Sequence, residues 1–462
     1  MRSRNFIPVR AIGALVLSAL LALASCEKPE PFSMDRSSET ITQTQYHHFT
    51  TSVSYDHVVL LYQAGFNSLS RYLEQNVEDL YSGYIPSSSR DVLLLLSHLP
   101  ERAGRYSVRT SPVLLRIEPD FKGNVQVDTL VVYPETTVSS SSETVRQVLT
   151  YVRDRFPSDS YGLILCSHAS GWLPEGYYAD PDTYEFGNVW SVSPGPRSVD
   201  AAYPGAFTYV DLPAEGSFPA VRSFGQDRVL VGSRDLTYEI DMADLAAAIP
   251  MHLDYILFDA CLMGCVEVAY QLKDVCDKVG FSPAEVLAEG FVYDKIPGHL
   301  LGQNDPDLQG VLNDFFEKYD KMDGSSRSAT ISLVDCTKLD RLASVCADLI
   351  GKYRTEIQTM DTDAVQRYFR HGRNYFYDLQ DIFVKAGISS TEASSLESAL
   401  SEVVLFKAAT PKFIDSFQIL SYSGLSMYLP AIAHDNPGRD YSFLNRYYRE
   451  SVAWNAAVGL VR

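Results

Sequence analysis

The chain has 462 residues, of which 46% are hydrophobic and 12% aromatic, so it can bury a large core and is not an intrinsically disordered protein. A chain of this length is expected to divide into two domains. The formal net charge of -19 is spread along the sequence rather than gathered in a tail. It provides no basic face for a nucleic-acid partner and favours cationic substrates instead.

The amino terminus has the pattern of an export signal. Three arginines within the first ten residues precede the apolar run 11–24, which is too short to span a bilayer but fits the hydrophobic core of a secretory signal. The run ends in LASC, residues 23–26, which resembles a bacterial lipobox. The resemblance implies cleavage before Cys26 and lipidation of its sulfur. The alternative is an ordinary signal whose cleavage site happens to contain a cysteine.

Four regions are expected along the chain. Residues 1–26 are the signal peptide, 27–50 a flexible tether, 51–325 an α/β domain and 326–462 a carboxyl-terminal α+β subdomain. Cleavage and lipidation at the end of the signal predict a protein anchored by lipid in a bacterial cell envelope, on the outer membrane or the cell surface. No other segment has the ~20 apolar residues of a membrane helix.

Strands and helices alternate in the first part of the α/β domain. Continuously apolar runs predict buried strands, and apolar residues at helical spacing predict helices between them. Such an alternation is typical of a mostly parallel sheet covered by helices on both faces, with functional sites just beyond the carboxyl ends of the strands. The predicted strands are 57–62, 92–96, 113–117, 129–133 and 161–166, and the predicted helices are 69–80 and 143–156.

The pattern changes after residue 324. A strand is predicted first, helices follow, and a short strand comes late, which is why this part is assigned to a separate subdomain packed on the core. The predicted strands are 329–334 and 424–429, and the predicted helices are 338–353, 362–369 and 394–406.

Two strands end in turns that carry reactive side chains. Strand 161–166 is followed by His168, and the apolar run 255–258 is followed by Asp259 and Cys261. If the two strands are neighbours in one parallel sheet, His168 and Cys261 lie at the same edge. A cysteine at a strand-to-helix turn beside a histidine is the arrangement that thiol catalysis requires. A helix starting directly after Cys261 would also favour its thiolate through the helix dipole.

Each of these residues also has a plainer interpretation. His168 can be a core histidine after a buried strand, and most of the six cysteines after the signal can be small core residues. Their spacing does not match that of a zinc site, so no metal site is predicted. The pair His371-Gly372 is a second histidine candidate, but it follows a helical pattern and is expected at the surface.

The two turns resemble the catalytic motifs of the clostripain-like cysteine peptidases, which share the caspase-type fold. The first motif is His-x-Ser-Gly-Trp at 168–172, and the second is Asp-Ala-Cys-Leu-Met-Gly at 259–264, in the family's order. Weaker similarity covers 282–291 and 423–430. The resemblance therefore extends over most of the chain after the tether. It implies a caspase-like, mostly parallel sheet flanked by helices, and hydrolysis of peptide bonds after Arg or Lys without a required cofactor.

The resemblance assigns roles to individual residues. It implies that Cys261 is the nucleophile and that His168 is the general acid and base. Asp259 matches the acid of the pocket for the basic side chain, where a bidentate carboxylate contact selects arginine, and Glu289 is a second acid. The backbone N–H groups of Ala169 and Cys261 are assigned to the oxyanion hole. The alternative for Asp259 is a helix cap.

One residue departs from the family pattern. The family usually has glycine directly after the histidine, whereas this chain has Ala169. Alanine still donates its backbone N–H, but it adopts a positive φ only reluctantly, so a site that needs that conformation would lose activity.

A long excursion, residues 173–238, separates the two motifs. Loops of this length are usually functional or disordered, and family members are often made as zymogens that are cut after the histidine. The arginines in this segment are therefore candidate points of self-cleavage, and the alternative is a surface loop that is never cut. The candidates are Arg197, Arg222, Arg228 and Arg234.

Some relatives respond to calcium, so calcium remains a candidate ligand, although no helix-loop-helix calcium motif occurs and the acidic pairs in 180–182 and 305–307 are isolated. The expected partners are peptides or proteins with basic residues, together with a membrane that holds the amino-terminal lipid. The protein itself is expected to be a monomer.

Two functions from different classes fit these features. The preferred one is a lipid-anchored cysteine endopeptidase that cuts after basic residues. The second is a catalytically weak or inactive surface lipoprotein that uses the same pocket to bind a peptide or another ligand. A thiol-dependent esterase or transpeptidase would share the catalytic pair, but an acidic pocket has no purpose for neutral acyl groups.

Overall fold

The computed structural model describes residues 54–88, 90–103, 106–108, 110–178, 181–186, 221–222, 227–231, 234–370, 374–431 and 441–462. The predicted signal peptide, Cys26, the tether and His371 lie outside these residues. The described residues all belong to one compact unit. In the described part of the chain, no helix is long and apolar enough to cross a membrane.

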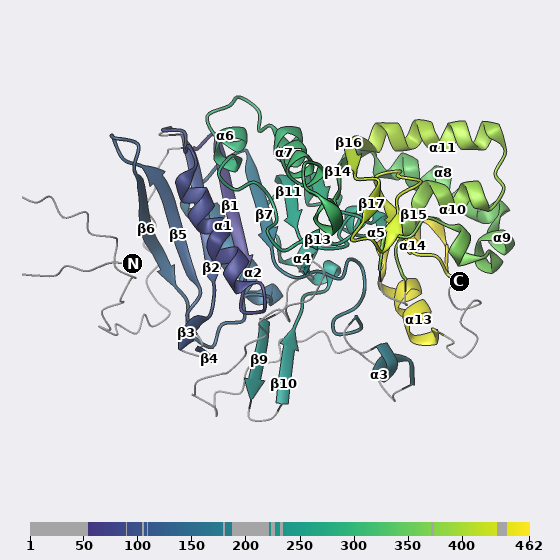
Figure 1. The fold of residues 1–462 in the computed structure, drawn as a ribbon, viewed down its shortest axis with the longest axis horizontal. Helices are drawn as coiled ribbons and strands as arrows, with labels where there is room; N and C mark the ends of the chain where they lie inside the picture. Colours follow the sequence, from purple (N-terminus) through teal and green to yellow (C-terminus); the bar gives the residue numbers. More distant parts are fainter. Residues whose placement is uncertain are drawn as a thin grey trace, which may run out of the picture. The chain divides into compact units, whose positions relative to one another are not determined.

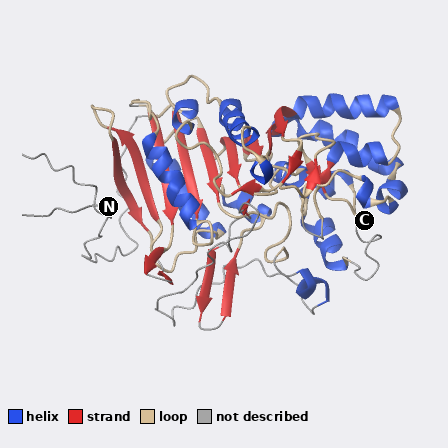
Figure 2. Ribbon diagram, viewed as in Figure 1, coloured by secondary structure: helices blue, strands red, loops and turns tan. Residues whose placement is uncertain are grey.

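The described residues build a nine-stranded sheet in the order β16-β14-β12-β11-β7-β1-β2-β5-β6, drawn in red in Figure 2, with all of its strands except β12 labelled in Figure 1. The five strands from β12 to β2 are mutually parallel, and the two strands at each margin are antiparallel to their neighbours. The predicted α/β class is therefore confirmed. The strands are β1 (His57–Ala64), β2 (Asp91–His98), β5 (Val113–Pro119), β6 (Val125–Val132), β7 (Tyr161–Cys166), β11 (Leu253–Asp259), β12 (Cys276–Phe281), β14 (Thr330–Asp335) and β16 (Val404–Ala409).

The central strands consist of apolar residues because both of their faces are covered. Every residue of β1 and of β7 is buried, as expected for parallel strands with helices on each side. The edge strand β6 is mostly exposed instead. The apolar runs thus mark the middle of the sheet, where β7 and β11 lie side by side.

The order of the strands determines which face each helix covers. The chain moves in one direction along the sheet from β1 through α1 (Ser70–Ser82) to β2, and in the opposite direction through α2, α4 and α5. Because crossovers between parallel strands are right-handed, α1 covers one face and the other three helices cover the opposite face. Figure 1 shows α1 lying across the sheet, and α4 contacts both α2 and α5. These three helices are α2 (Ser142–Arg155), α4 (Met242–Ala248) and α5 (Val266–Leu272).

Part of the predicted carboxyl-terminal subdomain joins the central sheet. Strands β14 and β16 continue it beyond β12 as antiparallel strands, so the predicted boundary near residue 325 falls within one sheet. The helices of this region are α8 (Leu339–Lys352), α9 (Arg354–Thr359), α10 (Leu379–Lys385), α11 (Ser390–Val403), α13 (Ser442–Ser451) and α14 (Ala453–Val458). Helix α8 contacts both α11 and α14.

The predicted helix 362–369 is wrong. Only a 3₁₀ turn, Thr362–Ala364, forms there. The following backbone is extended because it pairs with the segment around residue 377: Tyr368 N–H donates to the Phe376 carbonyl at 2.9 Å, and Asp378 N–H donates to the Gln366 carbonyl at 2.8 Å. Tertiary pairing thus overrides the local helical pattern.

The remaining elements are short, except for α7 (Leu308–Asp320), which has 13 residues and contacts β14 and β16. The short helices are α3 (Pro181–Phe186) and α6 (Ile296–Leu300). The strands are β3 (Glu101–Ala103), β4 (Tyr106–Val108), β8 (Val221–Arg222), β9 (Asp227–Val231), β10 (Arg234–Tyr238), β13 (Val286–Leu287), β15 (Tyr377–Asp378), β17 (Lys412–Phe413), β18 (Phe417–Gln418) and β19 (Ser426–Met427).

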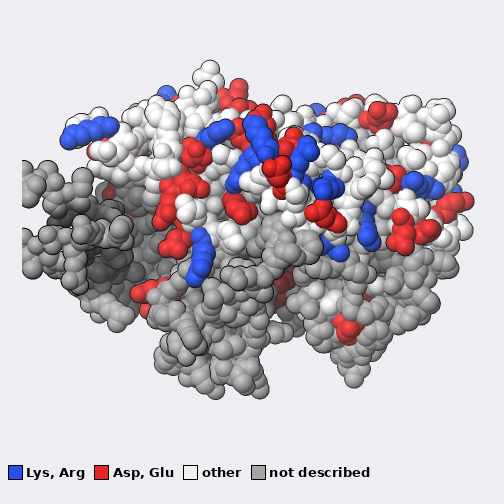
Figure 3. Space-filling model, in the orientation of Figure 1, with Lys and Arg blue, Asp and Glu red and all other residues white. Residues whose placement is uncertain are grey.

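Charges of both signs are interspersed on the face of the molecule drawn in Figure 3. A pocket that includes Asp79 of α1 and Asp314 of α7 is lined by acidic and basic side chains, among them Lys295 and Lys318. Lys295 pairs with Asp314 at 2.9 Å. Because the lysines in this region have acidic neighbours, the pocket is not a continuous basic surface of the kind that nucleic acids require.

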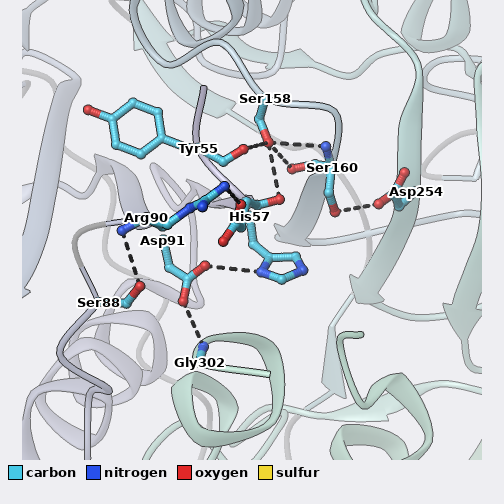
Figure 4. Close-up of polar contacts among 10 residues, drawn as sticks. Tyr55, His57, Ser88, Arg90, Asp91, Ser158, Ser160, Asp254 and Gly302 are labelled. Carbon is cyan, nitrogen blue, oxygen red and sulfur yellow. Dashed lines mark hydrogen bonds and ion pairs between the residues drawn. The ribbon is translucent and has the colours of Figure 1, made fainter. Parts of the chain in front are cut away.

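A polar network connects the amino-terminal ends of the central strands (Figure 4). At the start of β1, His57 Nδ1 lies 3.0 Å from Asp91 Oδ1, and the Gly302 N–H donates to the other oxygen of Asp91 at 2.8 Å. Ser160 before β7 donates to Asp254 of β11. His57 therefore has a structural role at the edge opposite to the carboxyl ends of the strands.

Candidate active site

The predicted catalytic turns lie at the same edge of the sheet. Strands β7 and β11 are parallel neighbours, and Asp259 lies directly opposite Cys166. His168 follows Cys166 by two residues, and Cys261 follows Asp259 by two residues. Because Asp259 and Cys166 lie opposite each other, both turns begin at the same level of the sheet. The two strands are ~4.8 Å apart, the usual spacing of adjacent strands. The prediction that the two strands are neighbours is therefore confirmed.

A second histidine at this edge is farther from the cysteine turn. His98 ends β2, which is three strands from β11, or ~14 Å by the usual strand spacing. Its Nδ1 lies 2.8 Å from Ser139 Oγ, and its ring stacks on Phe66. Among the histidines of the described sheet, His168 is thus the one whose turn adjoins that of Cys261.

The cysteine turn is a folded loop rather than the start of a helix. Helix α5 begins at Val266, five residues after Cys261, so the expectation of a helix directly after the cysteine is wrong. The helix is prevented because Leu262 has φ of +61° and donates its N–H to the Ala284 carbonyl at 2.9 Å. Helix dipoles act only within their first turn. The dipole of α5 therefore does not favour the thiolate of Cys261 in the way that the sequence predicts.

Contacts with β13 hold the Cys261 thiol in place. The side chain is buried, with the residue 1% exposed. Its Sγ accepts from the Val286 N–H at 3.1 Å, and the Val286 carbonyl lies 3.6 Å from the same sulfur. Both backbone groups of Val286 therefore fix the position of the sulfur.

The neighbouring Cys265 is less suited to be a nucleophile. Burial, reinforced by the nearby Glu267, raises the pKa of the Cys265 thiol well above its usual value. Burial also raises the pKa of Glu267 to about 7. The six cysteines of the described chain are all buried free thiols, which confirms that most of them are core residues.

The histidine loop and the cysteine loop touch at a glycine. Gly171 has φ of +63°, and a Cβ at this position would lie 2.7 Å from the Leu262 carbonyl oxygen. Ala169, in contrast, is buried and is not among the residues with positive φ in the described chain. Alanine therefore fits at this position without backbone strain, so the conformational concern about Ala169 does not apply.

Asp259 lies beneath the two loops and is fully buried. Its Oδ2 accepts from the hydroxyl of Tyr293 and from the Phe291 N–H, the latter at 3.4 Å. The hydroxyl of Tyr293 also lies 3.0 Å from Cys166 Sγ. The capping alternative for Asp259 is wrong, because α5 begins seven residues later and has Cys265 at its amino-terminal cap.

Glu289 belongs to the loop that closes over Asp259, but its own side chain is exposed. The loop is fixed from α7: Lys318 Nζ donates to the Gly290 carbonyl at 3.1 Å, and the Tyr319 hydroxyl donates to the same carbonyl at 2.9 Å. The structure therefore places the two predicted pocket acids at different depths. Asp259 is buried at the end of β11, and Glu289 is exposed on the loop that covers it.

A partly buried ion pair beside the cysteine turn was not predicted. Glu285 precedes Val286 and is 3% exposed, and its two oxygens lie 3.1 and 2.9 Å from Arg370 Nε. Burial raises the pKa of Glu285, and the Arg370 charge opposes that rise. Glu285 lies within a segment noted for its resemblance, but Arg370 comes from a distant part of the sequence and gave no signal.

The described residues contain no group of three or more His, Cys, Asp or Glu side chains that could hold a metal ion. The residues at this edge of the sheet include a thiol, an imidazole and a buried carboxylate, those of Cys261, His168 and Asp259. A family model for clostripain, Peptidase C11, matches residues 216–458. The chain belongs to the clostripain family.

Solved structures of family members have the same fold. An inactive zymogen C11 protease from Parabacteroides distasonis is 26% identical, with a TM-score of 0.66, and the match covers 88% of this chain and 98% of that one. A secreted C11 cysteine protease from Bacteroides thetaiotaomicron, in complex with an irreversible peptide inhibitor, is 23% identical, with a TM-score of 0.65 and coverage of 87% and 99%. No curated protein matches the chain.

Membership makes this chain a cysteine-type peptidase with a caspase-like fold. The clostripain match includes the cysteine turn, β13 and the Asp259 loop, but it begins after the histidine turn. The match of the Parabacteroides structure extends over most of the chain.

Proposed function

We propose that this clostripain-family protein is an endopeptidase that cleaves on the carboxyl side of Arg or Lys, with Cys261 as nucleophile and His168 as general acid and base. The main support is the pairing of β7 with β11, which brings the histidine turn and the cysteine turn to one edge of the sheet. The buried carboxylate of Asp259 lies at the end of the same strand as the cysteine turn. Thiol and imidazole chemistry needs no cofactor.

The proposed reaction moves one proton between sulfur, imidazole and the leaving amine. His168 takes the proton of the Cys261 thiol, and the thiolate attacks the carbonyl carbon of the scissile bond. The backbone N–H groups of Ala169 and Cys261 are assigned to the resulting oxyanion. His168 then gives its proton to the amine as the C–N bond breaks. A water molecule, deprotonated by His168, hydrolyses the thioester and regenerates the thiol.

Asp259 is assigned to the floor of the pocket for the basic side chain, and Glu289 to its rim. Replacement of Asp259 by Asn keeps the shape of the side chain and removes its charge. We expect kcat/KM for Arg peptides to fall ~10- to 100-fold, the equivalent of one charge-assisted hydrogen bond, while turnover of neutral peptides changes little. The check is kcat/KM for peptides that end in Arg or Leu. An unchanged preference for Arg would reject Asp259 as the pocket acid and would indicate Glu289 instead. Glu289→Gln is the matched control.

The excursion between the motifs is assigned to self-processing. Its short strand β8 pairs with β13, with Arg222 opposite Val286, the residue whose N–H donates to Cys261 Sγ. Of the four predicted arginines, Arg228 and Arg234 pair within the β9–β10 hairpin instead, and Arg197 lies outside the described residues. The structural relative from Parabacteroides is an inactive zymogen. Arg222 is therefore our preferred site of self-cleavage, and β8 blocks the site until the chain is cut.

Replacing Arg222 with alanine is expected to leave the purified chain in one piece, while the unmodified chain separates into two fragments at this residue. The reason is that a pocket selective for basic residues no longer recognises the β8 segment. Mass spectrometry of the fragments is the measurement, and Arg228→Ala is the matched control that is still cut. Cleavage of the Arg222→Ala chain at an unchanged rate would reject this site.

Lipid anchoring at Cys26 and binding of calcium are proposed as properties of the full chain. The support for the anchor is the sequence of residues 23–26, and the support for calcium is the family resemblance alone. Mass spectrometry of the protein from membranes would detect the lipid on Cys26. Unchanged turnover in the presence of a chelator would reject a role for calcium.

The second candidate is a peptide-binding protein without turnover, favoured by the burial of Cys261 and by the pairing of β8 with β13. Turnover of fluorogenic peptides that end in Arg, Lys, Asp or Leu, by the chain that lacks residues 1–26, separates the two. Cleavage only after Arg and Lys supports the endopeptidase, and equal cleavage after Leu rejects its specificity. No cleavage, even with calcium and after trypsin has nicked the 173–238 loop, favours the binding protein.

A further inference from the structure

The loop after β1 lies beside the histidine turn. Strand β1 is the neighbour of β7 on the side away from β11, and Gln63 lies opposite Cys166. The chain leaves β1 at Ala64 and enters α1 at Ser70. Residues in this short connection therefore project from the same edge of the sheet as His168, but from the opposite side of it relative to Cys261.

Two side chains hold this connection in place. Ser167 joins it to the histidine turn, and Asn67 forms hydrogen bonds within the connection. Ser167, the residue before the histidine, donates its hydroxyl to the Ala64 carbonyl at 2.7 Å. The Asn67 amide donates to the same carbonyl at 3.0 Å, and its oxygen accepts from the Leu69 N–H at 2.9 Å. Such a side-chain turn, with Asn67 buried, determines the backbone course on both sides of Ser68.

Ser68 contacts the imidazole directly. Its Oγ lies 2.8 Å from His168 Nε2. We propose that Ser68 is a positioning residue that accepts a hydrogen bond from Nε2–H of His168 and thereby reserves Nδ1 for the Cys261 thiol. This assignment rests on the proposed function, because it presumes that His168 is the proton carrier.

The two nitrogens then have separate tasks throughout the reaction. When Nε2 carries its hydrogen toward Ser68, Nδ1 of the neutral ring has the lone pair that takes the thiol proton. In the imidazolium form both nitrogens are donors, so Nε2–H keeps its bond to Ser68 while Nδ1–H holds the proton for the leaving amine. Because Ser68 accepts in both states, it stabilises the charged ring, and the charged ring stabilises the thiolate.

The test compares Ser68→Ala with Ser68→Thr, which restores a hydroxyl, and with Ser70→Ala, the same change at the first residue of α1. For Ser68→Ala we expect kcat to fall ~10-fold or more, the effect of one hydrogen bond to a charged group, with KM within about twofold. Ser68→Thr should recover most of the loss, and Ser70→Ala should behave like the unmodified chain. Equal melting temperatures exclude misfolding as the cause.

A second measurement does not depend on peptidase activity. The rate at which iodoacetamide alkylates Cys261 reports its thiolate, and we expect Ser68→Ala to slow alkylation about tenfold at pH 6 but not at pH 9, where the thiolate forms without the imidazolium. Slower alkylation of Ser68→Ala at pH 6 supports the role of Ser68 even if the chain cleaves no peptide. The absence of peptide cleavage would reject only the proposed function. Alkylation of Ser68→Ala at the unmodified rate at both pH values would overturn the assignment.

Discussion

Replacement of Cys261 by alanine is expected to lower peptide turnover by a factor of at least about 10³. Without the sulfur no thioester forms, and the oxyanion donors and the pocket can accelerate only a direct attack by water. The fold should persist, since the neighbouring contacts of the loop, such as Leu262 N–H to the Ala284 carbonyl, do not involve the thiol. The measurement is kcat/KM for an Arg peptide, with the melting temperature as the check of folding.

Cys346→Ala is the matched control. Cys346 is also a fully buried free thiol, but it lies on α8, away from the histidine and cysteine turns. We expect this variant to lose some stability from the small cavity and to keep its kcat/KM. Equal turnover by Cys261→Ala and the unmodified chain would reject Cys261 as the nucleophile and would direct attention to another thiol.

Gly171→Ala is expected to be strongly damaging, although it adds only one methyl group. The new Cβ would lie 2.6 Å from Phe376 Cε1 and 2.7 Å from the Leu262 carbonyl oxygen, at a residue with φ of +63°. The backbone conformation alone costs ~1 kcal/mol or more. The clash must in addition push the histidine loop away from the cysteine loop. Since a displacement of ~1 Å can lower turnover ~10²-fold, activity should fall further than stability does.

Gly351→Ala provides the comparison for that variant. Gly351 lies in α8, and a Cβ there meets no atom within 4 Å. Alanine in the last turn of this helix is expected to raise stability by up to ~0.5–1 kcal/mol and to leave turnover unchanged. Measuring kcat and the free energy of unfolding for both variants separates the two effects. A Gly171→Ala enzyme with unaltered turnover would show that the two loops do not need this close approach.

The central part of the fold was predictable because it obeys simple rules. Strands such as β7 and β11 are buried on both faces, so they appear in the sequence as apolar runs, and reactive residues directly after them must lie at the carboxyl edge. This reasoning needed only the adjacency of the two strands, which the pairing of Asp259 with Cys166 confirms. The burial of Asp259 beneath Tyr293 was not accessible in the same way, because a strand end does not reveal what covers it.

Long-range contacts account for what the sequence did not reveal. The cysteine turn has a helical pattern, but Leu262 is held at positive φ by contact with Ala284. Arg370 reaches Glu285 from a segment 85 residues away. Ser68 follows the predicted strand 57–62, so the rule that located His168 could have identified it. It was missed because a serine between a strand and a helix is common in ordinary loops.

The most direct measurement of the central claim is covalent trapping. The chain that lacks residues 1–26 is incubated with a peptidyl ketone inhibitor that ends in Arg, and in parallel with one that ends in Asp, and the digested protein is analysed by mass spectrometry. The account predicts that the Arg inhibitor adds its mass to Cys261 and that the Asp inhibitor does not. Labelling of a different cysteine, or equal labelling of Cys261 by both inhibitors, would contradict it.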